Sequence, residues 1–365
     1  MVALRLKSMV KSMFSFSFNK TVLSTLALAS VFAVAQVSVA SESHRSKKSN
    51  SKKSSLVHAK APSKHAPKHA TKHSKKHVLA AKSQKSAKAK RGIRHAVEIN
   101  EGPSIGDAVG LKHSKDALSL ASNAAFVVDQ DSSKVLFEKN AEVSLPIASI
   151  TKLMTSLVVV ESKLDLDEVI EITNEDLDKE KGTGSRLTIG AKLSRADLLH
   201  IALMSSENRA ASALGRSYPG GLPAFVAAMN AKAKQLGMND TYYVDSSGLS
   251  SKNVASARDL VKLINAAYQF PLIREYSTDS HYVVNPKGKR LLEYGTTNHL
   301  VEKSDWNIGL QKTGYIAEAG RCLVMQAIIE GRAVVMVFLD SKGKYSRLAD
   351  AGRIKKWIQG MRPQA

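Results

Sequence analysis

Two apolar runs near the C-terminal end have the strongest strand pattern in the chain. They cover residues 322–329 and 333–339, and the residues 330–332 between them have the composition of a hairpin turn. A second hairpin is predicted at residues 125–129 and 134–137, which flank a short Asp/Ser turn. The pattern therefore predicts strands at both ends of the region that follows residue 115.

Helical spacing of apolar residues marks the middle of this region and its last segment. We expect one buried helix to open at Ser149, and another at Ser194, where Asp197 completes a capping box. Further helices are expected at residues 210–214, at residues 222–235, after the capping residue Ser256, and at residues 348–358. Strands at both ends with helices between them predict one antiparallel sheet built from distant segments, with the last helix packed on it. About 250 residues are enough for one α/β sandwich of this kind.

The first forty residues have the pattern of a secretory signal peptide. Four basic residues precede an apolar run at 22–35, and the small residues 38–40 offer a cleavage site before Ser41. The apolar run is shorter than the roughly 20 residues that a membrane span needs. The sequence thus predicts export to the periplasm, with an uncleaved N-terminal anchor as the alternative.

The net charge of +22 is concentrated in the N-terminal part of the chain. Residues 41–95 contain 17 of the 54 basic residues and one acidic residue, whereas residues 96–365 have a net charge of only +2. The basic segment is rich in Lys, His, Ser and Ala and has almost no side chains to bury, so it is expected to be disordered.

A Lys-His pair recurs every four residues between Lys64 and His77. On a helix this spacing would align four histidines as candidate metal ligands, but Pro67 and repulsion between the lysines disfavour a helix. Nucleic acid is not an expected partner, because an exported protein meets anionic envelope material instead. The segment 41–95 is expected to be a pH-sensitive tether to an anionic envelope surface, and a solvated spacer is the alternative.

Three short motifs carry the candidate chemistry. They are, in order, Ser149-Ile150-Thr151-Lys152, Ser206-Glu207-Asn208 and Lys312-Thr313-Gly314. Together they supply a nucleophilic hydroxyl, an amine that can act as its base, and further groups that can move protons and hold an anionic substrate. Serine acyl transfer without histidine requires this set of groups.

The first motif suits this chemistry only if it lies at the start of a buried helix. Ser149 and Lys152 then share one face of the first turn, and the helix N-terminus favours a developing oxyanion. Burial would lower the pKa of Lys152, so that its neutral amine can accept the serine proton. The alternative is an ordinary N-cap serine followed by a solvated lysine.

The other two motifs have similar alternatives. Ser206 and Asn208 lie between two predicted helices, where they either project into a cleft or merely satisfy backbone groups at the junction. Lys312 is expected on an edge strand, where it either holds a substrate carboxylate or discourages edge-to-edge aggregation. Gly314 would leave room there for the substrate backbone.

The three motifs resemble the signature of penicillin-binding proteins and class A β-lactamases. Residues 203–211, 245–249 and 312–316 are similar, more narrowly, to the D-alanyl-D-alanine endopeptidases of the penicillin-binding protein 7 type. The resemblance covers almost all of the chain after residue 115, and Ser205 with residues 207–209 separates it from the carboxypeptidase branch of the family. It implies a β-lactamase/DD-peptidase-like α/β fold, in which an antiparallel sheet is flanked by helices and joined to an all-helical lobe.

The expected organisation of the chain has three parts. A signal peptide occupies residues 1–40, the basic Lys/His-rich disordered segment occupies residues 41–114, and the catalytic domain occupies residues 115–365.

The resemblance also implies roles for the catalytic residues. Ser149 is expected to be the acylated nucleophile and Lys152 its general base, while Ser206 relays protons to and from the leaving amine. The backbone N–H groups of Ser149 and Tyr315 are implied to form the oxyanion hole.

Substrate binding is assigned to five further positions by the same resemblance. Asn208 is expected to orient the substrate amide, and Lys312 and Thr313 are expected to bind the substrate carboxylate. The whole expected substrate-binding set is Asn208, Lys312, Thr313, Gly314 and Tyr315.

The implied activity is hydrolysis of D-alanyl cross-links in peptidoglycan by a serine endopeptidase. Peptidoglycan peptides are the expected partners, β-lactams the expected covalent inhibitors, and no cofactor or metal is expected. No deacylating glutamate of the β-lactamase kind can be identified, which disfavours antibiotic hydrolysis. A DD-carboxypeptidase that trims terminal D-alanine and a non-catalytic wall-binding protein remain alternatives. The single cysteine, Cys322, is expected to be a buried, inert thiol outside the catalytic site.

Overall fold

The computed structural model describes residues 102–286 and 290–361, and all of them belong to one compact unit that begins at Arg91. The predicted signal peptide and residues 41–101 of the predicted basic segment lie outside the described residues. Residues 102–114 of that segment are described, and they contain ordered elements at Ile105–Ala108 and Leu111–His113 that the expected disorder did not include. No helix within 102–286 or 290–361 is both long enough and apolar enough to cross a membrane.

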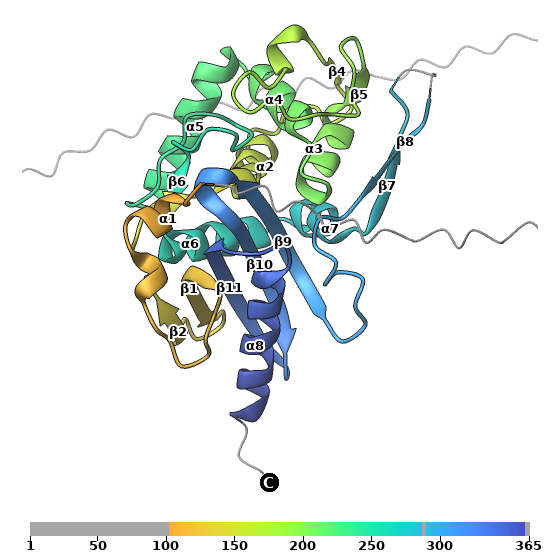
Figure 1. The fold of residues 1–365 in the computed structure, drawn as a ribbon. Coiled ribbons are helices and arrows are strands. Elements are labelled where there is room, and N and C mark those ends of the chain that lie inside the picture. The colour runs from red at the N-terminus through yellow and green to blue at the C-terminus, as the bar shows by residue number, and fades with distance from the viewer. Residues whose placement is uncertain (1–101, 287–289, 362–365) are drawn as a thin grey trace, which may run out of the picture. The chain divides into compact units, whose positions relative to one another are not determined.

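The centre of the unit is a five-stranded antiparallel sheet with the strand order β2-β1-β11-β10-β9 (Figure 1). The strands are β1 (Ser122–Asp129), β2 (Val135–Lys139), β9 (Asn307–Ile316), β10 (Gly320–Ile329) and β11 (Arg332–Ser341). Both predicted hairpins are present. Strand β1, from the beginning of the domain, pairs with β11, which comes about 200 residues later in the sequence. The prediction of one sheet built from distant segments is confirmed.

The long apolar runs of β10 and β11 arise because both faces of the sheet are covered. Along β11, Val335 and Val337 face the core beneath the helical lobe, whereas Met336 and Phe338 face the core beneath the C-terminal helix. Alternate residues of a strand point to opposite faces, so a strand buried on both sides reads as a continuous apolar run. Residue Glu330, with a φ of 54°, and Gly331, with a φ of 75°, form the tight turn that joins the two strands.

Helices cover the two faces of the sheet. Helix α8 (Ser346–Gly360) packs on one face through Ala351, Ile354 and Ile358, as predicted. Helix α6 (Ala257–Tyr268), which is capped by Ser256, covers the other face. The helices of the lobe are α2 (Thr151–Glu161), α3 (Arg195–Met204), α4 (Asn208–Arg216), α5 (Gly221–Gln235) and α7 (Pro271–Thr278).

Short elements complete the unit. Three two-stranded pairs are β3 (Leu145–Pro146) with β6 (Val254–Ala255), β4 (Val169–Glu171) with β5 (Lys192–Ser194), and β7 (His281–Val284) with β8 (Leu292–Gly295). A short helix α1 (Ile105–Ala108) and four 3₁₀ turns are also present among the described residues: η1 (Leu111–His113), η2 (Ala148–Ile150), η3 (Asn174–Asp176) and η4 (Ala317–Ala319).

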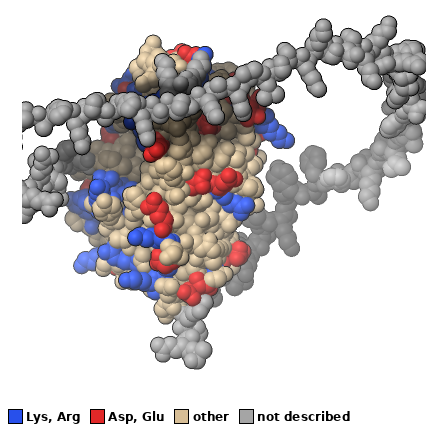
Figure 2. All heavy atoms as spheres, turned by 90° about the vertical axis from the view of Figure 1, so that its right-hand side faces the viewer, with Lys and Arg blue, Asp and Glu red and all other residues tan. Residues whose placement is uncertain are grey.

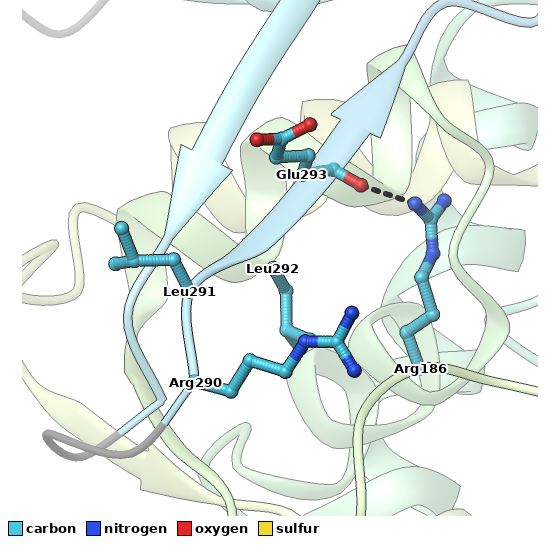
Figure 3. A pocket seen from close by; sticks show the side chains of 5 residues that line it. All are labelled: Arg186, Arg290, Leu291, Leu292 and Glu293. Atoms are coloured by element: carbon cyan, nitrogen blue, oxygen red, sulfur yellow. Dashed lines mark hydrogen bonds between the residues drawn. The ribbon is translucent and has the colours of Figure 1, made fainter. Parts of the chain in front are cut away.

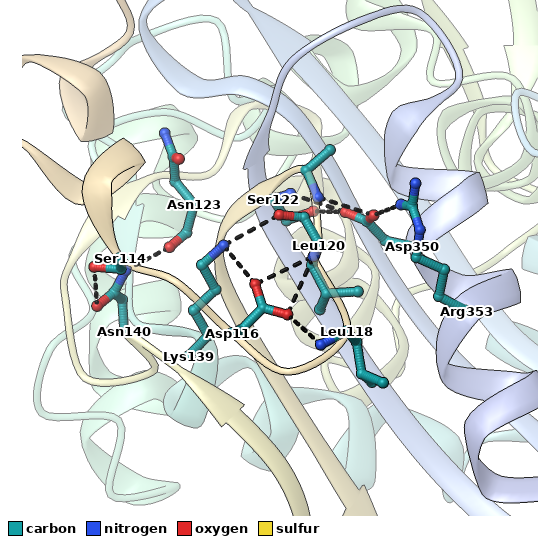
Figure 4. A network of polar contacts seen from close by, with 11 residues as sticks. Ser114, Asp116, Leu118, Leu120, Ser122, Asn123, Lys139, Asn140, Asp350 and Arg353 are labelled. Carbon is teal, nitrogen blue, oxygen red and sulfur yellow. Dashed lines mark hydrogen bonds and ion pairs between the residues drawn. The ribbon is translucent and has the colours of Figure 1, made fainter.

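A polar network holds the segment before β1 between β2 and α8 (Figure 4). The Asp116 carboxylate accepts hydrogen bonds from the backbone N–H groups of residues 118 and 120 and pairs with Lys139 at 3.0 Å. On the other side, Asp350 of α8 accepts from the backbone N–H and the hydroxyl of Ser122, at 2.8 and 2.6 Å. Because both carboxylates are buried, these bonds hold the start of β1 in register.

Charges of both signs are mixed on the face that Figure 2 presents, around a largely uncharged middle. This distribution agrees with the net charge of only +2 for residues 96–365. The described unit therefore offers no large single-sign patch on that face, and the excess positive charge of the chain lies before residue 96.

Candidate active site

Ser149 lies in a tight turn between the sheet and the first helix of the lobe. The pattern predicts that Ser149 opens the helix, whereas α2 begins at Thr151 and Ser149 belongs to the preceding 3₁₀ turn η2. No side chain caps α2, so Ser149 is not the N-cap serine of the alternative interpretation. Ala148 has a φ of 48°, a left-handed conformation that is costly for alanine and is typical of functional sites.

Two glycines pack directly against this turn and explain its shape. A Cβ atom on Gly314 would lie 2.8 Å from the Ile147 carbonyl oxygen and 3.0 Å from the Ser149 nitrogen. A Cβ atom on Gly248, which has a φ of 82°, would lie 2.0 Å from the Ala148 carbonyl oxygen. Only residues without a side chain permit this approach, so β9 and the 245–250 loop hold the turn from two sides.

Lys152 is fully buried beside Ser149. Its Nζ donates to the Ser149 Oγ at 2.9 Å, to the Asn208 Oδ1 at 2.7 Å and to the Ser247 carbonyl oxygen at 2.5 Å. Burial lowers the pKa of Lys152 to about 7, although the negative charges of Asp245 and Glu207 oppose part of the shift. The amine is therefore neutral in a large fraction of molecules near neutral pH.

The contacts of Lys152 define where its lone pair points when it is neutral. A neutral amine keeps two N–H donors, and two of its three partners, the amide oxygen of Asn208 and the carbonyl of Ser247, can only accept. The third partner is the Ser149 hydroxyl, which can donate. The neutral amine thus directs its lone pair at the Ser149 proton, as a general base must.

The second motif forms the turn between α3 and α4. Ser206 has a φ of 62° and is half-buried, and its Oγ accepts a hydrogen bond from the Nζ of Lys312 at 2.8 Å. Asn208 is the first residue of α4, and its Nδ2 donates to the Thr183 Oγ1 at 3.0 Å. Glu207 is the N-cap of α4 and accepts from the backbone N–H of residue 209. A cavity of about 430 Å³ lies against this turn, lined by residues 184–186 and 205–208.

The third motif lies on the edge strand β9, as predicted. Lys312 is fully buried, and its Nζ also donates to the Thr313 carbonyl oxygen at 2.8 Å. Burial and the positive charges of Lys152 and Arg347 lower the pKa of Lys312 well below its usual range. The Thr313 Oγ1 lies 2.6 Å from the Thr297 Oγ1, and the Tyr315 ring packs against the Arg321 guanidinium at 4.2 Å.

The structure thus brings residues of all three motifs into two neighbouring hydrogen-bonded groups. One group runs from Ser149 through Lys152 to Asn208, and the other joins Ser206 to Lys312. Together they provide the hydroxyl of the half-buried Ser149, two buried amines of lowered pKa and the hydroxyl of Ser206. This arrangement can activate a serine and return a proton to a leaving group.

Several residues of the site are absent from the three motifs. Thr183, Thr297 and the carbonyl of Ser247 contact motif residues, and Asp245 holds the Ser247 loop by accepting from the backbone N–H groups of residues 247, 248 and 250. The Asp-Ser-Ser-Gly composition at 245–248 is a turn signal, but it does not identify the distant lysine to which the carbonyl is presented. Thr183 and Thr297 have no signal in the sequence.

Within residues 102–286 and 290–361 no group of three or more His, Cys, Asp or Glu side chains is arranged to hold a metal ion. Cys322 is buried, as predicted, and burial raises the pKa of its thiol to about 12.

The chain is similar to known proteins over most of the described region. Residues 111–343 match the family model of the D-alanyl-D-alanine carboxypeptidases. The chain is 49% identical over 241 residues to a D-alanyl-D-alanine endopeptidase of Pseudomonas aeruginosa, covering 66% of this chain and 78% of the relative. It is 46% identical over 243 residues to the D-alanyl-D-alanine endopeptidase of Escherichia coli, with the same shares of the two chains.

The fold is also found in a solved structure. The crystal structure of the Streptomyces K15 DD-transpeptidase is similar to this one with a TM-score of 0.62 and 25% sequence identity, covering 68% of this chain and all of the other. The predicted fold class, an antiparallel sheet with flanking helices and a helical lobe, is thereby confirmed.

Proposed function

The chain belongs to the D-alanyl-D-alanine carboxypeptidase family of serine peptidases, and we propose that it is an endopeptidase that hydrolyses the D-alanyl cross-links of peptidoglycan. The observation that carries this proposal is its close similarity, over two thirds of the chain, to two relatives named as D-alanyl-D-alanine endopeptidases. The segment 205–209 contains the middle motif and the N-cap of α4, and its sequence supports assignment to the endopeptidase branch of the family.

The proposed reaction begins with transfer of the Ser149 proton to Lys152. The Ser149 Oγ attacks the carbonyl carbon of the D-alanyl residue as the Nζ of Lys152, 2.9 Å away, takes its proton. The negative charge that develops on the carbonyl oxygen is stabilised by the backbone N–H groups of Ser149 and Tyr315. The contact of Gly314 with the Ser149 nitrogen supports this oxyanion hole, because it brings the two chain segments together.

The tetrahedral intermediate then collapses with loss of the amine. The C–N bond breaks as the proton on Lys152 passes to the leaving amine through the Ser206 hydroxyl, which Lys312 holds, and an ester remains on Ser149 beside a neutral Lys152. In the second half, a water molecule attacks the ester and gives its proton to Lys152. The Ser149–acyl bond breaks as Lys152 returns this proton to the Ser149 Oγ, so the acid product leaves and both the Ser149 hydroxyl and the neutral Lys152 are restored.

Substrate binding is proposed for the residues that border these reacting groups. Asn208 would hold the substrate amide, since its Oδ1 and Nδ2 both lie in the network. Lys312 and Thr313 would attract the carboxylate next to the scissile bond, and Gly314 and Tyr315 would border the extended peptide along β9.

A muropeptide digest separates the endopeptidase from the carboxypeptidase, which the family description also supports. Purified protein should convert cross-linked muropeptide dimers to monomers at least about tenfold faster than it shortens free pentapeptides, a preference of roughly 1.4 kcal/mol. Both products are measured by mass spectrometry, with the Ser149→Ala variant as the control for contaminating enzymes. Faster loss of terminal D-alanine from pentapeptides would identify a carboxypeptidase instead.

We also propose a periplasmic location and a role for residues 41–95 in retaining the protein on anionic envelope material. The support is the signal-peptide pattern at 1–40 and the 17 basic residues of the segment. Deletion of residues 41–95 is expected to weaken co-sedimentation with isolated envelopes and to flatten its salt dependence. Turnover of a small soluble peptide should stay within about twofold, since the site is built from residues 147–315.

A length-matched control tests whether charge is responsible for this retention. Replacing the lysines and arginines of residues 41–95 with glutamine keeps the spacing and removes the charge. Equal binding of the intact and the neutral forms would reduce the segment to a spacer. A large loss of turnover on the soluble peptide would show instead that the segment contacts the active site.

A further inference from the structure

A second cavity, of about 590 Å³, lies between the loop at 184–186 and the β7–β8 hairpin (Figure 3). Its lining residues are Arg186, Arg290, Leu291, Leu292 and Glu293. Figure 3 shows the side chains of Arg186 and Arg290 extending into the space from opposite sides, while the carboxylate of Glu293 points away from the Arg186 guanidinium. The cavity therefore presents two cationic groups and a partly apolar wall.

Arg186 is held in position although its side chain is exposed. Its guanidinium packs over the Tyr294 ring at 4.1 Å from the ring centre, and its Nη1 donates to the Glu293 carbonyl oxygen. Tyr294 is itself buried, so the stacking surface is rigid. A guanidinium has five N–H donors, and this is the one hydrogen bond that the Arg186 guanidinium makes to another described residue. The remaining donors can bind a ligand. A guanidinium fixed in this way loses less freedom when it binds an anion than a mobile side chain does.

The arginine cavity adjoins the proposed catalytic centre. Arg186 also lines the cavity of about 430 Å³ beside Ser205, Ser206 and Asn208, so the two spaces share this side chain. The same loop carries Thr183, which accepts a hydrogen bond from Asn208 at 3.0 Å. A peptide that reaches Ser206 can thus continue past Arg186 into the second cavity.

We propose that Arg186 and Arg290 form a subsite for a carboxylate of the stem peptide, away from the scissile amide. The proposal rests on the proposed function, because it concerns the cross-linked peptide that the site would hydrolyse. Two guanidinium groups match the planar, two-oxygen shape of a carboxylate. Leu292, which lies on the same side of the strand as Arg290, provides an apolar surface for the aliphatic part of the same residue. The ligand class is therefore an amino acid with an aliphatic stem and a free carboxylate, within a peptide.

The test compares two synthetic cross-linked peptide dimers, one with free carboxylates on its stem residues and one with those carboxylates amidated, while the carboxylate next to the scissile bond stays free in both. For the free dimer, the double variant Arg186→Gln/Arg290→Gln should raise KM about tenfold with kcat within about twofold. The wild-type protein should show a similarly raised KM on the amidated dimer, and the double variant should raise it no further. The Arg290→Lys variant should retain part of the affinity for the free carboxylate, because lysine keeps the positive charge although it loses the planar shape of the guanidinium.

Two controls separate a binding effect from a structural one. Arg274→Gln removes an arginine that also packs on a tyrosine, Tyr268, outside this cavity, and it should leave both KM values unchanged. Arg290 makes no hydrogen bond or ion pair with another described residue, so the single variant Arg290→Gln tests the subsite without removing the Arg186–Tyr294 contact. Thermal melting of each variant checks that the fold is retained.

The outcomes distinguish failure of the subsite from failure of the proposed function. Equal KM values for the two dimers, or equal effects of the double variant on both, would overturn the subsite. Absence of cleavage of either dimer by the wild-type protein would overturn the endopeptidase proposal. The dissociation constants of both dimers for Ser149→Ala, with and without the arginine substitutions, would then still decide the subsite, since they do not depend on turnover.

Discussion

The Ser149→Ala variant is expected to lose acylation by a labelled penicillin and to cleave cross-linked peptide at least about 10⁴-fold more slowly. Among the described residues no other hydroxyl is hydrogen-bonded to the Nζ of Lys152, so no neighbouring group can replace the nucleophile. The fold should persist, because the lost Oγ contributes one hydrogen bond, worth about 1 kcal/mol. Gel fluorescence of the labelled protein and a thermal melt measure the two effects.

The matched control is Ser156→Ala. Ser156 lies on α2 close to Lys152 and is fully buried, but its Oγ donates to the carbonyl of Lys152 at 2.7 Å. This variant should label normally, with only a small loss of stability. Persistent labelling of Ser149→Ala together with loss of labelling in another serine variant would mean that Ser149 is not the nucleophile.

Replacement of Lys152 is expected to have the next largest effect. Lys152→Arg should retain less than about 1% of the acylation rate, because a guanidinium does not release its proton at accessible pH and cannot serve as the base. Arginine is also larger than the fully buried site allows, so Lys152→Met is needed as a second variant of similar volume. Both variants should be inactive, and the methionine variant should remain folded. A substantial acylation rate in either would limit Lys152 to positioning the serine.

The pH dependence of acylation gives an independent test of the same role. Only the neutral amine can accept the Ser149 proton, and burial lowers the pKa of Lys152 to about 7. The acylation rate is therefore expected to be low at pH 5, to rise through about pH 7 and to level off at higher pH. Stopped-flow measurements with a chromogenic β-lactam between pH 5 and 9 would show this limb. A rate that is already constant at pH 5 would exclude a lysine of this pKa as the base.

Much of the fold follows from local patterns. The hairpins that became β1–β2 and β10–β11 are visible as apolar runs around turn residues, and the helices after Ser194 and Ser256 begin at the predicted caps. At Ser194 only half of the predicted capping box forms, since Asp197 accepts instead from the Tyr282 hydroxyl at 2.7 Å. That bond joins residues 85 positions apart, which a local pattern cannot anticipate.

For the candidate site, too, some features could be predicted from the sequence and others could not. The order and residue types of the three motifs identify the reacting groups, because nucleophile, base and proton relay each require particular side chains. They do not reveal that Ser149 precedes the helix, that Ala148 is left-handed, or that Gly248 closes the turn from a distant loop. These features depend on packing between chain segments about a hundred residues apart.

The sequence by itself determined the two main hairpins, most of the helices and the chemistry that the motifs can perform, since these depend on side-chain type and short-range spacing. Only the tertiary structure brings the carbonyl of Ser247 to Lys152 as its third hydrogen-bond partner and pairs Ser206 with Lys312. It also decided the lowered pKa values of both lysines and the arginine cavity beside the site. Desolvation and hydrogen-bond distance are properties of atoms brought together by folding, and neither is set by neighbours in the chain.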